Sequence, residues 1–524
     1  MAKTSIQSQK DDQLKPATSY VMFTENTDGF NPPVADAGLI KTRKDRILAS
    51  LGSNAEMISI VVQGYNRLEK TRNCVESILK YTTGHDFELI LVDNGSTDGT
   101  LEYYQSVVCA KKKIVRVTKN VGSVVPVMKY IDGRYVAYIC NDTYVTQNWI
   151  ENLLACLKSD DAIGMVVPLT SNGSNLQGID LPFSSLEEMY EKAAAYNHSD
   201  PGKWHERLRL VVQMAVYKRE ALDVAGVLLD YGYYHDFADD DITFRIRRTG
   251  YKTILCKDTF VHHDHIRKAL SAAEAEDFNR SIAAGKRDFG TKFFGLDAWT
   301  DVNNYEPTLM SFVDPGKHDA KMLVKALGVD VLCGTPILEL KNKLRENHLY
   351  DVELSAFSTH PKYWLDLKTI CSGKVFVDRI EHIGDHFNQP IFDYVFLDKP
   401  VNLYANPETL LQAAFSSLKP GGVLLLKLKN SVDFITLFHK LGINIAVADD
   451  NPPALSDLTI DGLLLKLDQI GFRNPKLGVE NWAVDPNQIQ MIKNTIISNQ
   501  LSDNIDASLK TLLIKDFCVS VNKT

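Results

Sequence analysis

The stretch VAYICNDTYVTQNWI, residues 136–150, decides the fold of the region around it. Its first five residues are an apolar, β-rich run, typical of a strand buried in a parallel sheet. The run stops at the polar residues Asn141 and Asp142. Open α/β sheets bind ligands beyond the carboxyl ends of their strands, so Asp142 is a candidate metal ligand. The alternative is that Asp142 or Thr143 only caps the helix that follows.

Length and composition limit the classes of protein to consider. At 524 residues the chain is too long for one ordinary core, which predicts two or three domains. A net charge of −8 argues against a nucleic-acid partner. No apolar run is long enough for a transmembrane segment and the start lacks a signal-peptide core, so we expect a cytoplasmic protein or one peripheral to the inner face of the membrane. The eight cysteines show no C-x-x-C spacing, which indicates neither a zinc site nor a disulfide framework.

Strands and helices alternate on the amino-terminal side of the opening stretch. Residues 58–62, 87–93 and 113–118 are expected strands, and residues 68–81 form an amphipathic helix between the first two. This alternation predicts an α/β fold with a parallel sheet built from right-handed crossovers. No G-x-G-x-x-G follows the first strand, which disfavours a dinucleotide-binding fold. Residues 1–55 form a polar extension with one helix around residue 45.

Four segments between residues 56 and 300 carry a family resemblance, in a fixed order. They read SIVVQGYNRLEKTRNCVESILKYT (59–82), FELILVDNGSTDGT (87–100), NDTYVTQNWIENLL (141–154) and VYKREALDVAGVLLDYGYYHDFADDDITFRIRRTGYKTILCKDTFVHHDH (216–265). Together they resemble a family 2 glycosyltransferase with the GT-A fold. The resemblance implies an enzyme that transfers a hexosyl or deoxyhexosyl group from a UDP-, GDP- or dTDP-linked sugar.

The same resemblance implies where the nucleotide-sugar binds. An aromatic face such as that of Tyr65 can stack on a base, and a strand-end carboxylate such as Asp93 can accept from base or ribose. The alternative for Asp93 is a turn into Gly95, a role that can coexist with binding. The expected nucleotide-sugar contacts are Gln63, Tyr65, Asn66, Arg67, Asp93, Asn94, Asn120, Gly122 and Asn141.

The family's D-x-D metal motif falls on Cys140-Asn141-Asp142, so its last carboxylate is kept and its first is replaced. Asp142 is therefore the expected ligand of Mn²⁺ or Mg²⁺, which oxygen ligands and phosphates suit. A histidine after the last strand often completes such a site, and TILCKDTFVHHDH (253–265) offers His262, His263 and His265. Only alternate residues of a strand share a face, so the adjacent His262 and His263 should face apart. We rank His263 first by its spacing and His262 second; the alternative is a surface imidazole.

Three consecutive carboxylates, Asp239, Asp240 and Asp241, open an expected helix. The family's Glu-Asp pair falls on Ala238-Asp239, so the resemblance implies Asp239 as the general base for an inverting transfer, with Asp240 as the second candidate. We expect Asp241 to cap the helix. In the less patterned region before them, Trp204 and His205 are candidate acceptor contacts, or else half-buried packing residues.

A second α/β pattern follows a linker at residues 301–325. FDYVFLDKPVNLYANPETLLQAAFSSLKPGGVLLLKLKN (392–430) resembles the late strands of a class I methyltransferase. The loop at 333–336 carries a single glycine and a proline where that family needs a glycine-rich cradle, and no acid ends the second strand unless Glu353 substitutes. We therefore expect no S-adenosylmethionine at residues 326–440, which instead dock an acceptor or a second subunit. Residues 441–524 are an α/β region of unknown role.

The sequence thus predicts an α/β protein with a GT-A nucleotide-diphospho-sugar transferase domain at 56–300 and a second, Rossmann-like (methyltransferase-like) α/β domain. The predicted function is inverting, metal-dependent glycosyl transfer to a hydroxyl of a surface glycan or a protein, for example flagellin. Two alternatives remain open: a bifunctional glycosyltransferase and methyltransferase, and a catalytically inactive scaffold that binds a nucleotide-sugar.

Overall fold

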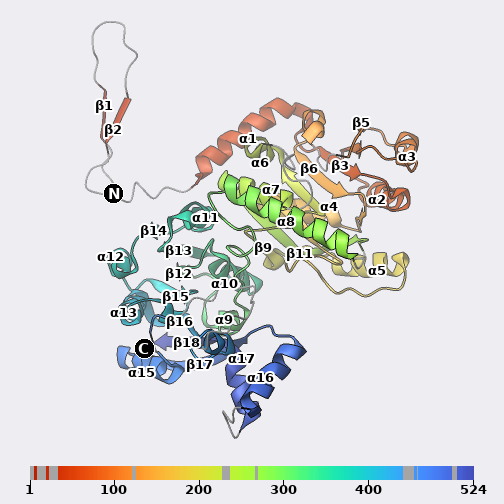
Figure 1. Cartoon of the computed structure of the whole chain (residues 1–524). Coiled ribbons are helices and arrows are strands. Elements are labelled where there is room, and N and C mark those ends of the chain that lie inside the picture. The colour runs from red at the N-terminus through yellow and green to blue at the C-terminus, as the bar shows by residue number, and fades with distance from the viewer. Residues whose placement is uncertain are drawn as a thin grey trace.

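Two large β-sheets organise the chain, one in each half, and helices cover both (Figure 1). The computed structural model describes all residues except 1–4, 9–18, 23–33, 121–124, 227–236, 266–269, 441–453, 457 and 499–503. A separate antiparallel pair, β1 (Ser5–Ser8) and β2 (Ser19–Met22), precedes both sheets. No helix in the described part of the chain is both long and apolar enough to cross a membrane.

The first sheet has nine strands in the order β5-β4-β3-β6-β10-β8-β11-β7, with β9 paired to β11. Its strands are β3 (Ile58–Gly64), β4 (Phe87–Asp93), β5 (Lys112–Arg116), β6 (Tyr135–Cys140), β7 (Thr143–Tyr144), β8 (Ile163–Thr170), β9 (Trp204–Glu206), β10 (Met214–Lys218) and β11 (Lys252–His263). The predicted parallel arrangement holds for β3 to β6, which crossovers connect. It fails at β10, which runs antiparallel to both of its neighbours, β6 and β8.

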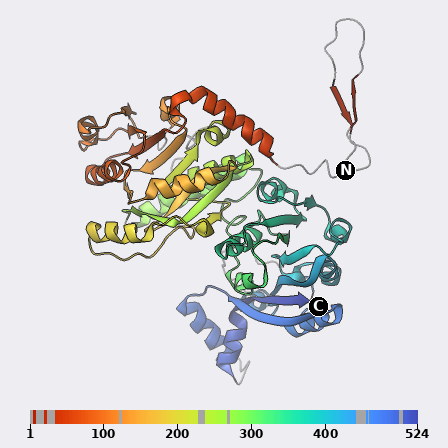
Figure 2. The ribbon, with the colours of Figure 1, turned by 180° about the vertical axis from the view of Figure 1, so that it is seen from behind.

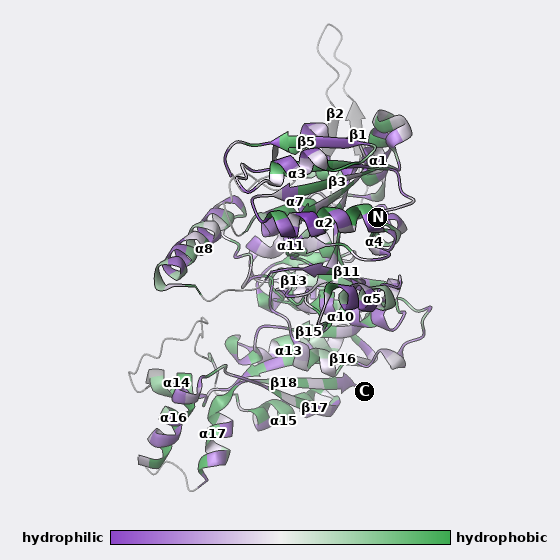
Figure 3. Cartoon of the chain, turned by 90° about the vertical axis from the view of Figure 1, so that its right-hand side faces the viewer, coloured by the Kyte–Doolittle hydropathy of each residue, from purple (hydrophilic) through white to green (hydrophobic). Residues whose placement is uncertain are grey.

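Helices lie on and around this sheet. They are α1 (Ala37–Leu51), α2 (Leu68–Tyr81), α3 (Thr100–Ser106), α4 (Trp149–Ser159), α5 (Leu186–Tyr196), α6 (Arg219–Ala225), α7 (Ala238–Arg248) and α8 (Ala272–Lys292). Helix α2 buries Cys74, Val75 and Ile78 and turns a hydrophilic surface outward, as Figure 3 shows. This helix has the limits that its 3.6-residue periodicity predicts.

The helix of the amino-terminal extension, α1, lies against the first domain in both views (Figures 1 and 2). Arg43 donates from Nη1 to the carbonyl of Thr249 at 2.6 Å. Gly250 has a φ of +96°, and a Cβ there would lie 2.2 Å from the Cβ of Ala35. The expected helix is therefore confirmed, and it is part of the first domain's packing.

The second sheet has seven strands in the order β14-β13-β12-β15-β16-β18-β17. They are β12 (Val324–Val329), β13 (Val352–Ser358), β14 (Val375–Val377), β15 (Phe392–Leu397), β16 (Leu418–Lys429), β17 (Phe472–Asn481) and β18 (Ile514–Lys523). The first five are parallel and follow the order of a doubly wound α/β sheet. Strand β18 pairs antiparallel with both β16 and β17. The sheet thus continues past the domain limit expected at residue 440, because late strands complete it.

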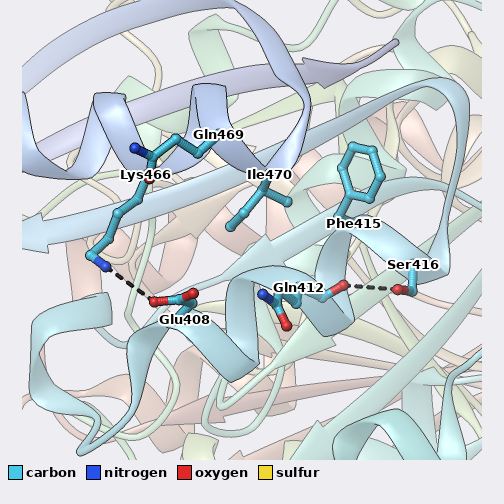
Figure 4. A pocket seen from close by; sticks show the side chains of 7 residues that line it. All are labelled: Glu408, Gln412, Phe415, Ser416, Lys466, Gln469 and Ile470. Atoms are coloured by element: carbon cyan, nitrogen blue, oxygen red, sulfur yellow. Dashed lines mark hydrogen bonds and ion pairs between the residues drawn. The ribbon is translucent and has the colours of Figure 1, made fainter.

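The helices of this domain are α9 (Pro307–Ser311), α10 (Thr335–Glu346), α11 (Trp364–Ile370), α12 (Ile383–His386), α13 (Pro407–Ser417), α14 (Phe434–Lys440), α15 (Ile460–Ile470), α16 (Pro486–Ser498) and α17 (Ile505–Leu513). A groove of about 410 Å³ lies between α13 and α15 (Figure 4). Lys466 and Glu408 form an ion pair across it at 3.1 Å. The expected linker at 301–325 contains α9 and so is partly helical.

Buried charges join the two domains. Asp366 of α11 is fully buried and accepts from Arg247 at 2.9 Å and from Arg248 at 2.7 Å, both at the carboxyl end of α7. Glu206 of β9 pairs with Lys341 of α10 at 2.6 Å. A buried ion pair that loses one partner leaves an uncompensated charge, so these contacts fix the domains to each other.

Candidate active site

The carboxyl ends of β3, β4 and β6 meet at one edge of the first sheet. In the register of these parallel strands Gly64 lies opposite Asp93, and Gln63 lies opposite Cys140. Three loops separated by dozens of residues therefore converge: the one after Gly64, the one after Asp93 and the one after Cys140. This is the edge at which open α/β sheets bind ligands.

One carboxylate oxygen of Asp93 stabilises the turn after β4, and the other has no hydrogen-bond partner. Its side chain is fully buried, and Oδ1 accepts from the backbone N–H of Ser96 at 2.9 Å. Oδ2 has no hydrogen-bond partner, and the nearest cation is Arg116, whose Nε lies 3.7 Å away. Both atoms of the buried Asn94 amide also lack a hydrogen-bond partner. Buried polar atoms of this kind need an explanation, and a bound ligand is one.

The loop after β3 is fastened in an unusual backbone conformation. Asn66 and Arg67 have φ values of 56° and 61°, in the left-handed region that side-chain-bearing residues rarely adopt. The Asn141 side chain holds the loop by donating to the carbonyl of Asn66 at 3.0 Å. Tyr65 is 46% exposed at its tip, and Gln63 accepts from the hydroxyl of Tyr138 at 2.8 Å.

Two expected nucleotide-sugar contacts, Asn120 and Gly122, come after β5 in the sequence. Asn120 is partly exposed. Gly122 falls among the residues that the structure does not describe. The remaining expected contacts, Gln63, Tyr65, Asn66, Arg67, Asp93, Asn94 and Asn141, come together at the ends of β3, β4 and β6.

Asp142 lies in a cluster of potential metal ligands with His263 and His265, whose ligand atoms are all within 4.8 Å of one another. The cause is a strand pairing: β7 runs antiparallel to the end of β11, so Thr143 lies opposite His263. Oδ1 of Asp142 is 3.5 Å from Nε2 of His263, and Oδ2 is 4.0 Å from Nδ1 of His265. One buried carboxylate and two imidazoles form a donor set that a divalent cation can use.

Electrostatics keep Asp142 ionised. Burial acts to raise its pKa, but the hydrogen bond with His263 and the charges of His263, Arg67 and His265 together lower it. Arg67 donates from Nη1 to Oδ2 of Asp142 at 2.8 Å. The carboxylate is therefore available as an anion at neutral pH.

His262 faces the other way, as the alternation along a strand predicts. Its Nδ1 lies 2.6 Å from Oγ of Ser171, and its ring packs edge-on against Phe183 and Tyr144. Burial lowers the pKa of His262 to about 4, so it is neutral. The structure groups His265 with Asp142 and His263, and places our second-ranked histidine outside the cluster. His265 is two residues beyond His263, and residues two apart share a face of an extended chain, so the period of two is the signal that could have ranked His265 above His262.

The three aspartates at the start of α7 have separate partners, and none caps the helix. The N-cap residue is Phe237, without a side-chain capping bond. Asp241 instead accepts a hydrogen bond from Arg245 at 2.7 Å and forms an ion pair with Lys292 at 2.6 Å, so its expected capping role is wrong. Asp240 is buried against Arg209 and the indole N–H of Trp299. Of the three, only Asp239 is partly exposed.

Asp239 and Asp142 flank the same strand end. The backbone N–H of Val212 donates to Oδ2 of Asp239 at 3.0 Å, and the next residue, Gln213, accepts from the N–H of Cys140 at 2.9 Å. Burial, then the charge of Asp142 and to a smaller extent that of Asp239, raise the pKa of the Cys140 thiol to about 12. A strand-end carboxylate with histidines and a second, partly exposed carboxylate are thus brought to one place.

Trp204 and His205, the candidate acceptor contacts, lie on β9 and are buried. The indole N–H of Trp204 donates to Asp258 at 2.7 Å. Nε2 of His205 lies 2.8 Å from Glu346, on α10 of the second domain. These contacts match the packing alternative and place both side chains at the junction between the domains.

Residues 59–223 match the model of the family described as Glycosyl transferase family 2. This match supports the predicted family 2 glycosyltransferase domain, and with it a transferase, for that part of the chain. Among curated proteins, the chain is 34% identical over 119 residues to glycosyltransferase GlyG of Streptococcus pneumoniae serotype 4. The matched part is 21% of this chain and 37% of GlyG, so the chain spans well under two thirds of that relative's length.

Solved structures give weaker likenesses. The mannosyltransferase PcManGT of Pyrobaculum calidifontis, solved with GDP-Man and Mn²⁺, is 17% identical with a TM-score of 0.31, over 47% of this chain and 69% of that one. A SAM-dependent methyltransferase of Archaeoglobus fulgidus is 16% identical with a TM-score of 0.29, over 45% of this chain and 99% of that one.

Proposed function

We propose that this chain, whose residues 59–223 form a family 2 glycosyltransferase domain, is an inverting, metal-dependent glycosyltransferase. The observation that carries the proposal is the convergence of two kinds of carboxylate at one sheet edge. Asp142 stands with two imidazoles, and the partly exposed Asp239 approaches the same strand end. Asp142, through a divalent cation, suits a leaving diphosphate, and Asp239 suits an acceptor hydroxyl.

The donor in this proposal is a UDP-, GDP- or dTDP-linked sugar. The half-exposed ring of Tyr65 offers a stacking face for the base. Oδ2 of Asp93, which has no hydrogen-bond partner, offers a buried acceptor for a base N–H or a ribose hydroxyl. The unpaired amide of Asn94 supplies both a donor and an acceptor beside it. Pairing these buried atoms would remove a cost of about 1–3 kcal/mol each.

The residues around Asp142 fit a divalent cation. Asp142 is anionic and buried, and Nε2 of His263 and Nδ1 of His265 face it. Because imidazole is a poor ligand for Mg²⁺, the two histidines favour Mn²⁺. A cation held there supplies Lewis-acid chemistry, by neutralising the charge that develops on the leaving diphosphate.

Asp239 is the proposed general base. The acceptor oxygen forms a bond to the anomeric carbon while the bond from that carbon to the diphosphate breaks, and the hydroxyl proton passes to Asp239. A single displacement of this kind inverts the configuration. Asp240 is less suited because Arg209 and Trp299 already occupy its oxygens.

The acceptor in this proposal is a hydroxyl of a surface glycan or of a protein, with flagellin as one example. Trp204 and His205 are already engaged at the domain junction and are not part of this proposal.

For the second domain we propose docking without a cofactor. The crevice at the carboxyl ends of β12 and β15, where doubly wound sheets bind ligands, contains residues 301–304 of the chain itself. Thr335 donates to the carbonyl of Val302 at 2.5 Å, and Asn304 donates to Asp398 at 2.8 Å. A Cβ on Gly334 would lie 2.4 Å from Ile370, so protein atoms use the space that its missing side chain leaves.

Glu353 does not replace the missing acid of that domain. It lies at the amino end of β13, the wrong end for a ribose contact, and pairs with Lys325 at 2.9 Å. Both observations favour the single-function glycosyltransferase over the bifunctional alternative.

Calorimetry with UDP and GDP, with and without Mn²⁺, tests the proposal. We expect one of them to bind wild type more tightly with Mn²⁺, and Asp142→Ala to lose most of that difference because the buried ligand is gone. The control is Asp132→Ala, whose carboxylate is 55% exposed and pairs with Lys113. Metal-dependent binding that survives in Asp142→Ala would remove Asp142 from the site, and the absence of nucleotide binding by wild type would overturn the proposed function.

A further inference from the structure

We propose that Arg67 is a displaceable counter-ion, which neutralises Asp142 when no cation is bound and turns to the donor's diphosphate when one is. The inference rests on the function proposed above. It goes beyond that function because it makes Arg67, until now only an expected nucleotide-sugar contact, a switch between Asp142 and the diphosphate.

The geometry places Arg67 in competition with a cation. Its Nη1 lies 2.8 Å from Oδ2 of Asp142, the same oxygen that faces His265 at 4.0 Å. The Asp142 side chain is 8% exposed, so without a positive partner it would be a buried, uncompensated charge. A guanidinium and a divalent cation cannot both sit against this oxygen without strong repulsion.

The backbone around Arg67 is a fixed pivot. Asn66 donates its N–H to Ser96 at 2.9 Å, and its side-chain oxygen accepts from Thr97 at 2.9 Å. Two successive left-handed residues store strain, which is kept where a side chain must be aimed. The Arg67 side chain, by contrast, is 53% exposed and so is free to turn about that pivot.

The destination of the displaced side chain follows from its chemistry. Arg67 is the N-cap residue of α2 and follows the carboxyl end of β3, beside the ends of β4 and β6. A diphosphate bridged to Asp142 by a cation therefore lies within reach of the same pivot. Guanidinium pairs with phosphate oxygens through two parallel hydrogen bonds, so the loss of Asp142 as a partner is offset by a new anion.

The test compares Arg67→Ala and Arg67→Lys with wild type in two titrations. With Mn²⁺ alone, Arg67→Ala should bind about three- to tenfold more tightly, because a charge-assisted contact no longer has to be broken. With saturating Mn²⁺, the same variant should bind UDP or GDP about tenfold more weakly, since it lacks the phosphate contact. Arg67→Lys keeps the charge without the planar fork and should lie between the two.

Arg72→Ala is the matched control. Arg72 is an exposed arginine on the same helix, stacked on Tyr103, and its removal should change neither titration. Unchanged or weaker Mn²⁺ binding by Arg67→Ala would overturn the counter-ion role, as would a failure of both wild type and variant to bind Mn²⁺. Unchanged nucleotide binding would overturn the diphosphate contact. Failure of the proposed function is distinguishable, because it would show in wild type as loss of nucleotide binding.

Discussion

Asp239 is partly exposed to solvent, whereas Asp240 and Asp241 are buried, and this difference sets its chemistry apart. We expect Asp239→Asn to keep the fold and donor binding and to lower turnover by roughly 10²–10⁴-fold, the usual contribution of a general base. Transfer rates measured at saturating donor and Mn²⁺ test this.

Asp240→Asn is the matched comparison. It weakens the buried contact with Arg209, so it should lower the melting temperature more than Asp239→Asn does and lower turnover less. Loss of transfer in Asp240→Asn, with an active Asp239→Asn, would move the base by one residue.

Glu306 gives a prediction about pH. It shares Lys427 with Asp398, at 2.5 Å and 2.9 Å, and one ammonium cannot neutralise both carboxylates. Burial raises the pKa of Glu306 from 4.5 to about 10. The charge of Lys427 acts to lower this pKa, and the charge of Asp398 acts to raise it further. The folded state then keeps a proton that the unfolded chain loses above pH 4.5. The contribution of Glu306 to the free energy of unfolding is therefore complete below pH 4.5 and declines as the pH rises toward 10.

Glu306→Gln should remove this decline, because an amide keeps a hydrogen-bonding group and has no proton to lose. We expect the fall in melting temperature between pH 6 and pH 9, conditions chosen inside that window, to be smaller than in wild type. Glu381→Gln, which changes an exposed glutamate of the same domain, should follow wild type. Equal pH profiles for Glu306→Gln and wild type would mean that Glu306 is ionised in the folded state.

For single residues, the sequence predicts well those features that depend on neighbours in the chain. Asp142 follows directly from a strand that ends in a carboxylate, and the opposite directions of His262 and His263 follow from the period of two. Partners that are distant in the chain do not follow: Lys292 takes Asp241 away from its expected cap, and Glu346 takes His205 away from the acceptor. Pairing across 50 to 140 residues is decided by tertiary structure, which local patterns do not contain.

Helix α7 is the element that connects the two domains to the candidate chemistry. Its first turn carries Asp239, and its last turn places Arg247 and Arg248 on Asp366 of the second domain. We expect Asp366→Asn to lower the free energy of unfolding by about 3–5 kcal/mol, because two buried guanidinium groups lose their anion. Urea denaturation measures this.

The control for that prediction is Asp385→Asn, an exposed carboxylate in the same domain, which should change stability by less than about 0.5 kcal/mol. A similarly small effect of Asp366→Asn would show that water or neighbouring groups compensate the arginines. Rescue by Asp366→Glu, even in part, would tie the effect to the charge.

Elements with a strong period were predicted well, and strand direction was not. Helix α2 and strand β4 have the limits read from the sequence, because one has a clear 3.6-residue stripe and the other is a continuous apolar run ending in Asp93. Strands β10 and β18 look like their parallel neighbours in composition, yet both run antiparallel. Direction depends on how the preceding segments return across the sheet, and these are the least patterned parts of the chain.

At the scale of the whole molecule, the chain's own residues 301–304 lie in the crevice at which a doubly wound sheet such as that of the second domain binds ligands. We expect full-length protein to show no saturable heat of binding with S-adenosylmethionine, because Val302 and Asn304 hold the crevice at the ends of β12 and β15. The positive control is titration of the same sample with nucleotide and Mn²⁺, which shows that the protein is folded and able to bind a ligand. A micromolar isotherm with S-adenosylmethionine would revive the bifunctional alternative.

The position of β18 has a consequence for how the protein is made. This strand, Ile514–Lys523, lies between β16 and β17, both of which the ribosome delivers earlier. Until residues 514–523 emerge, β16 and β17 each present an unpaired edge, and such edges are where nascent chains stick to one another. The delay between the synthesis of β17 and that of β18, and chaperones that cover strand edges, should therefore affect how much of this protein folds without aggregating.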